Sequence, residues 1–138
     1  MRRVKPVFFL LICILFMATM PLAADMHSDY TVILQTLLDN LNFLRDGIKP
    51  EMNDHDLIIH LEEYLEAMSL LDEMTRTMRE KYPEAAEIGK KDMTPEEKKL
   101  QAQIVDFYVN INPLLEMLAV HADTNPAISE YMNKIMGF

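Results

Sequence analysis

The sequence predicts an all-α protein, an antiparallel four-helix bundle with a kinked third helix and a short last helix. In four segments apolar residues recur at spacings of three and four, which places them on one face of a helix. The chain contains only 3 Gly in 138 residues, whereas the hairpins of a β-sandwich or barrel need Gly-rich turns. Because short polar connections join the four segments, consecutive helices are expected to pack antiparallel.

Residues 1–24 have the pattern of a secretory signal peptide. Arg2, Arg3 and Lys5 precede an apolar run over residues 7–20, and small residues follow at Ala23 and Ala24. Cleavage there would leave residues 25–138 as a single helical-bundle domain of an exported, periplasmic or secreted protein. An uncleaved anchor is the alternative, because residues 7–24 reach the short end of a membrane span.

The first helix of the bundle is predicted to begin at Ser28, a capping residue, and to end at Gly47. Its apolar stripe consists of Tyr30, Leu34, Leu37, Leu41, Leu44 and Ile48. The second helix has Asn53 or Asp54 as N-cap and is stopped by Pro83. Its stripe consists of Leu57, Leu61, Tyr64, Met68, Leu71, Thr75, Met78 and Tyr82, and residues 84–88 are expected to add one further turn.

The third helix begins with the clearest start signal in the chain. Thr94-Pro95-Glu96-Glu97 combines a capping box with proline at the first helical position. Pro113 then falls inside the stripe of Leu100, Ile104, Phe107, Ile111, Leu114, Leu118 and His121, where it predicts a kink near residues 109–113 or, alternatively, two shorter helices.

The last helix is predicted to be about a dozen residues long. Asp123, Thr124 or Asn125 can cap it, with Pro126 at its first position. Its apolar face consists of Ile128, Met132 and Ile135. Because this helix is shorter than the others, one end of the bundle is expected to be open or completed by a partner chain, so oligomerisation is one option.

The charge of the exported part restricts its partners. Removing residues 1–24 takes away three basic side chains and leaves 10 basic against 22 acidic residues, a formal charge of −12 over 114 residues. Nucleic acid and anionic membrane surfaces would repel such a protein, so neither is expected to bind it. The only cysteine, Cys13, lies in the leader, and disulfides therefore cannot stabilise the domain.

The sequence shows no pattern of a catalytic site. It lacks the Glu-x-x-His pairs of di-iron bundles, the His-Glu-x-x-His of zinc proteases and a Gly-rich phosphate loop. The clustered carboxylates, such as Glu62-Glu63 and Glu96-Glu97, fit the solvated faces of amphipathic helices. We therefore expect no enzyme and no obligatory cofactor.

In an up-down-up-down bundle the chemically distinctive side chains fall into two groups, one at each end. One end gathers His55, His60, His121, Met52 and Met117, and the other gathers Met26, His27, Met74, Met78, Met93, Met132 and Met136. Met74 and Met78, one helical turn apart, offer soft ligands suited to Cu(I). Core packing or partner contact is the favoured interpretation of these methionines.

A second metal hypothesis concerns the new N-terminus. Cleavage after Ala24 would leave Asp25-Met26-His27, and a free amine with His at the third position can bind Cu(II) or Ni(II) through four nitrogens in a square plane. Cleavage after Ala23 moves His27 to the fourth position and destroys this chelate.

The chain combines a leader followed by Ala24-Asp25, a cysteine-free mature part of four predicted helices, Asp106-Phe107, and Tyr131-Met132-Asn133-Lys134. In outline these features resemble those of the small soluble periplasmic b-type cytochromes. The resemblance implies a four-helix bundle with haem b held by a Met near the start of the first helix and a His near the end of the last. Tyr30 and Met132 stand near those positions, and the last helix has no His. A haem site would instead use His27 with Met132 or Met136, beside Met26.

Two functional readings follow. The favoured one is an exported, non-catalytic binding module that acts on an unidentified envelope protein through a Met-rich apolar surface inside an acidic rim. The alternative is a carrier of haem b or copper at the Met-rich end of the bundle.

Overall fold

The computed structural model describes residues 24–83 and 92–137, and these residues form five helices with no strand. The helices are α2 (Ala24–Gly47), α3 (Asp54–Lys81), α4 (Pro95–Val109), α5 (Asn112–Ala122) and α6 (Pro126–Met136). The prediction of an all-α protein is therefore confirmed. The predicted leader before Ala24 and the predicted turn at residues 84–88 lie outside the described residues.

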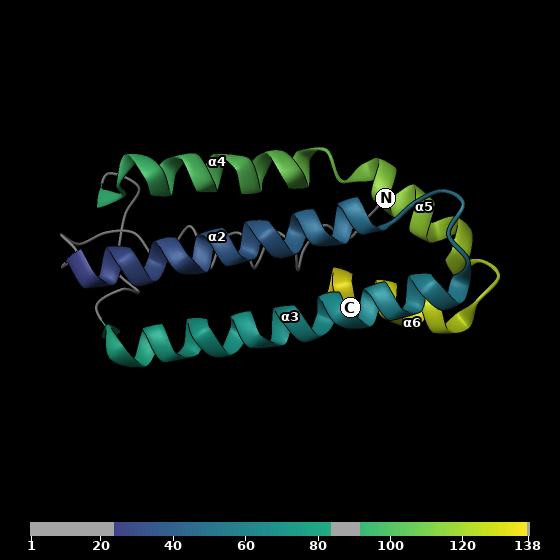
Figure 1. Ribbon diagram of the computed structural model, residues 1–138, viewed down its shortest axis with the longest axis horizontal. Coiled ribbons are helices and arrows are strands. Elements are labelled where there is room, and N and C mark those ends of the chain that lie inside the picture. Colours follow the sequence, from purple (N-terminus) through teal and green to yellow (C-terminus); the bar gives the residue numbers. More distant parts are fainter. Residues whose placement is uncertain (1–23, 84–91, 138) are drawn as a thin grey trace.

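Helix α2 is the centre of the structure. It packs against α3 on one side and α4 on the other, while α6 packs against both α5 and α3 (Figure 1). Lys81 and Tyr82 at the end of α3 donate hydrogen bonds to Asp29 in the first turns of α2. Helices α2 and α3 are therefore antiparallel. His27 of α2 pairs with Glu97 in the first turn of α4, so the starts of those two helices lie together.

The core follows the predicted stripes. All six apolar residues predicted for the first helix are buried, as are most of those predicted for α3 to α5. The buried apolar residues of these later helices include Leu57, Leu61, Tyr64, Leu71, Met78, Leu100, Ile104, Phe107, Leu114 and Leu118. In α6 only Ile128 is buried, and Met132 and Ile135 are partly exposed.

Three predicted helix starts are confirmed in detail. Asn53 caps α3 by accepting a hydrogen bond from the backbone of Asp56. Thr94 and Glu97 form both bonds of the capping box. Asn125 caps α6 through the backbone of Ala127, with Pro126 in the first turn. Each start is set by residues within four positions of one another, which explains why the sequence alone predicted it.

Two predicted boundaries need correction. Ser28 is not the cap of the first helix, because α2 begins at Ala24 and Ser28 lies one turn inside it. The predicted kinked third helix is two helices, as in the alternative, with α4 ending at Val109 and α5 starting at Asn112. Pro113 has no backbone N–H and its ring would clash with the carbonyl of Val109, so a straight helix cannot continue through this segment.

Gly47 ends α2 as predicted, and the His60 ring packs so closely against it that a side chain would not fit. Its φ is not positive, since among the described residues only Gly137 has a left-handed conformation. A Cβ on Gly47 would instead lie 2.0 Å from Cε1 of His60, so only glycine leaves room for this imidazole.

Candidate functional site

The residues predicted for a metal or haem site at the start of the chain are already engaged. Asp25, Met26 and His27 belong to the first turn of α2, and Met26 is buried in the core. Nδ1 of His27 lies 2.6 Å from Oε1 of Glu97, a side chain with 0 % exposure, and Oε2 of Glu97 accepts from the backbone N–H of Thr94. A chelate through the amides and imidazole of these residues would require this turn to unwind.

The structure does not bring the four haem candidates Met26, His27, Met132 and Met136 together. Helix α6 begins near the start of α3, where the side chain of Asn125 donates to Asp54. It has 11 residues, about 16 Å, against 28 in α3, about 42 Å. Met136 therefore ends beside Met68, halfway along α3, and not at the start of α2.

Two of the three histidines predicted for the opposite end of the bundle have structural roles. Nε2 of His60 lies 3.0 Å from the backbone carbonyl oxygen of Leu44, and its ring packs 4.4 Å from that of Phe43. His121 lies 2.7 Å from Oδ1 of Asp54. Hydrogen bonds from His121, and then from Asn125, lower the pKa of the Asp54 carboxyl. His55 is exposed.

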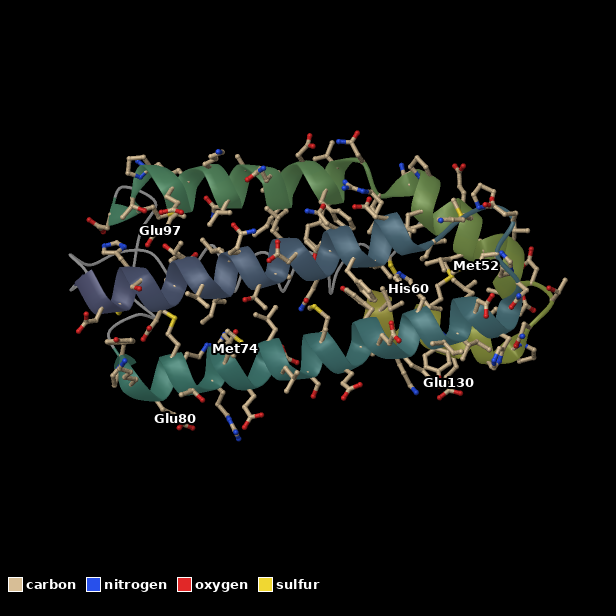
Figure 2. All side chains as sticks on the ribbon, viewed as in Figure 1. Met52, His60, Met74, Glu80, Glu97 and Glu130 are labelled. Carbon is tan, nitrogen blue, oxygen red and sulfur yellow. The ribbon has the colours of Figure 1, made fainter. Side chains whose placement is uncertain are left out.

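Met74 and Met78 line an apolar groove between α2 and α3. The groove has a volume of about 630 Å³. Figure 2 shows Met74 on the side of α3 that faces α2, while Glu80 points the other way. Among the described lining residues there is no His or Cys that would complete a soft metal site. The lining consists of Asp29, Val32, Ile33, Leu70, Glu73, Met74, Thr77, Met78 and Lys81.

The groove exposes large apolar side chains. Val32 of α2 is 51 % exposed and Leu70 of α3 is 59 % exposed, although they sit on either side of the same groove. Phe43 and Ile59, each 41 % exposed, lie three turns further along the same faces, because 11 residues are almost exactly three helical turns. These four residues, which we call the α2–α3 apolar face, include most of the exposed large apolar residues in the described chain.

A second, smaller cavity of about 370 Å³ lies where α6 stops. Tyr64, Met68, Tyr108, Ile135 and Met136 contribute to its lining. Burial raises the pKa of the Tyr108 hydroxyl to about 12 and that of Tyr64 further, so both remain protonated in any physiological setting. This cavity is part of the packing between α3, α4 and α6.

Sequence reasoning missed two features of this site. Glu97 was assigned to a capping box and to a solvated carboxylate cluster, yet its side chain is fully buried against His27. The α2–α3 apolar face was also missed, although a signal was present. Val32 and Phe43, like Ile59 and Leu70, stand 11 residues apart off the core stripes, and the residues one helical turn away from them are mostly polar.

Over residues 24–83 and 92–137 there is no cluster of three His, Cys, Asp or Glu placed to hold a metal ion. The same residues contain no helix with the length and hydropathy of a membrane span. Comparison with protein-family models, curated proteins and solved structures found no match.

Proposed function

We propose that the protein is an exported, non-catalytic binding module that uses no cofactor and acts on another envelope protein through the α2–α3 apolar face. Export is supported by the basic, apolar and small-residue pattern of residues 1–24. A binding role is supported by the lack of catalytic motifs in the sequence and by an apolar surface that the fold leaves open.

We further propose an antiparallel four-helix bundle in which α4 and α5 together make the third helix and α6 is the short fourth. Three interhelical contacts support it. Asp29 joins the start of α2 to the end of α3, His27 and Glu97 join the starts of α2 and α4, and Asp54 joins the start of α3 to the end of α5 and the cap of α6. These contacts are those of an up-down-up-down order.

The observation that carries the proposal is the exposure of Val32 and Leu70 on both sides of one groove. Exposed leucines and valines occur singly on most proteins, but a groove with apolar side chains on both walls and methionines at its floor is typical of an adaptable binding surface. The free energy of binding would come from burying these side chains, about 25 cal/mol per Å².

The test is site-specific photocrosslinking in the producing cell. A photoreactive side chain at Leu70 should crosslink to a discrete partner. A matched probe at Val120, which is 69 % exposed on α5, should not. Equal crosslinking at both sites, or none at Leu70, would contradict the proposal. The mass of the recovered chain, starting at Ala24 or Asp25, tests export separately.

A further inference from the structure

The α2–α3 apolar face has a regular pattern on both of its helices. On α2 the stripe consists of Val32, the half-buried Thr36, Asp39 and Phe43, and on α3 an exposed stripe consists of Ile59, Glu63, Glu66 and Leu70. Both stripes follow the spacing i, i+4, i+7, i+11, which runs along one side of a helix for about 16 Å. Each stripe therefore has an apolar residue at either end, with Glu63 and Glu66 between them on α3 and Asp39 between them on α2, and Val32 and Leu70 line the groove at one end.

Such a pattern has the dimensions of a helix-binding groove. Two antiparallel helices with apolar residues about three turns apart can receive a third helix that carries apolar anchors at matching intervals. The pair Val32 and Leu70 would contact one anchor, and the pair Phe43 and Ile59 another. The partly buried Met74 at the floor can adjust to the shape of the anchor.

The charge of the face selects the partner. Between Asp54 and Glu73 the chain has seven carboxylates and no Lys or Arg, and Lys81, which lines the groove further along α3, is paired with Asp29. Some of these are committed elsewhere, as Asp54 is to His121 and Glu62 is to Tyr131. Glu63 and Glu66 are exposed, and within the described residues neither takes part in an ion pair. Both therefore stand uncompensated beside Ile59 and Leu70.

A second copy of this chain is a poor occupant, because it would bring the same carboxylates against themselves. An anionic lipid surface is repelled for the same reason. We infer that the α2–α3 groove binds a cationic amphipathic helix of a partner protein, with apolar anchors between its two walls and Lys or Arg beside Glu63, Glu66 and Asp39. This inference rests on the proposed function and specifies its partner.

The test uses two synthetic helices of about 18 residues, or five turns, and the purified protein. Both peptides carry the same leucine stripe at i, i+4, i+7 and i+11, and their remaining positions carry mainly Lys in one and mainly Glu in the other. We expect the Lys peptide to bind at least about tenfold more tightly, with an affinity that falls as salt is raised. Fluorescence anisotropy measures both affinities.

Charge reversal on the face is the decisive variant. Glu63→Lys with Glu66→Lys should weaken the Lys peptide about tenfold or more. The matched control, Glu116→Lys with Glu130→Lys, reverses two exposed carboxylates on α5 and α6 and should change the affinity less than about twofold. Glu63→Gln with Glu66→Gln, which introduces no new charge, should weaken binding by an intermediate factor. Circular dichroism establishes that each variant keeps the helices.

Three results would overturn the inference. If the Glu peptide binds equally well and Leu70→Ser weakens both, the groove takes helices of any charge, and only the proposed function stands. If a concentration-dependent dimer forms in sedimentation and Leu70→Ser dissolves it, the occupant is a second copy. If neither peptide binds, the cationic helix is wrong, and crosslinking at Leu70 decides separately whether the groove has any partner.

Discussion

At the scale of single residues, the carboxylate of Glu97 shows how one side chain can hold two elements together. It has no exposed surface, and its two oxygens accept from the Thr94 backbone and meet the His27 ring at 2.6 Å. The sequence predicted the first bond, since Thr94 and Glu97 are three positions apart. It could not predict the second, because a pair separated by 70 positions depends on how α2 and α4 are aligned.

Removing His27, the partner of this buried carboxylate, is expected to destabilise the folded protein. His27→Ala should lower the free energy of unfolding by about 2 to 3 kcal/mol, because Glu97 keeps a desolvated oxygen without its partner. In the double variant with Glu97→Gln, the His27→Ala substitution should cost less, since a neutral amide is cheaper to leave unpaired. Urea unfolding measures both. A cost that is equal in the two backgrounds would show that the pair is not coupled.

The carboxyl of Asp54 should give the protein an acid-sensitive contact. Its pKa is lowered by hydrogen bonds from His121 and Asn125, so in the folded state it stays ionised at pH values where the unfolded chain binds a proton. The stability that it contributes is therefore present above its ordinary pKa, near 3.9, and is lost as the pH falls through the lowered value. Asp54→Asn should remove this part of the pH dependence.

Thermal unfolding between about pH 2 and pH 7 measures this effect. Asp56→Asn is the matched control. Asp56 lies in the same first turn of α3 but bonds only to Asn53, so its replacement should leave most of the acid dependence in place. Identical pH profiles for Asp54→Asn and the unmodified protein would refute the role given to Asp54.

At the scale of the helices, the sequence was most informative about starts and core stripes and least informative about breaks. The starts at Asn53, Thr94 and Asn125 depend on short-range hydrogen bonds. The effect of Pro113 was foreseen, yet choosing between a kink and two helices depends on the packing of α5 against α6, which the sequence does not encode locally. The early start of α2 also depends on tertiary packing, because Met26 and Tyr30 are buried in the core.

The end of α2 should not tolerate a larger residue. Gly47→Ala places a methyl group 2.0 Å from His60, and the ring is fixed by Leu44 and Phe43. We expect a loss of about 1 to 3 kcal/mol in the free energy of unfolding. In a His60→Ala background the same change should be neutral or stabilising, since alanine is the better helix former. A destabilisation that persists without His60 would contradict the steric explanation.

Truncation of two adjacent leucines of α3 should change the stability of the protein by very different amounts. Leu71 is buried, and Leu71→Ala should cost about 2 to 4 kcal/mol of stability. Leu70 is exposed in the groove, and Leu70→Ala should change stability by less than about 0.5 kcal/mol. Denaturant unfolding of the two variants compares them directly. A large cost at Leu70 would mean that the groove is closed by the protein itself.

At the scale of the whole molecule, the acidic charge and the exposed apolar residues have to be considered together, because the charge affects what can bind to the apolar face. A formal charge of −9 disfavours association of the chain with copies of itself, which helps an apolar face to stay open. The sequence predicted the acidic rim and an adaptable apolar surface, but it placed that surface at the Met-rich end with Met132 and Met136. The short α6 ends with Met136 beside the middle of α3 instead, and the open face lies between α2 and α3.

The most direct test of the proposed binding surface is thiol labelling in the producing cell. The chain has one cysteine, at position 13, so Leu70→Cys and Val120→Cys each add a single thiol whose labelled peptide can be resolved by mass. We predict that Leu70→Cys is protected in the cell and reactive in the purified protein. Val120→Cys should be labelled equally in both settings. Equal labelling of Leu70→Cys in the cell and after purification would show that the groove has no occupant there and would contradict the proposed function.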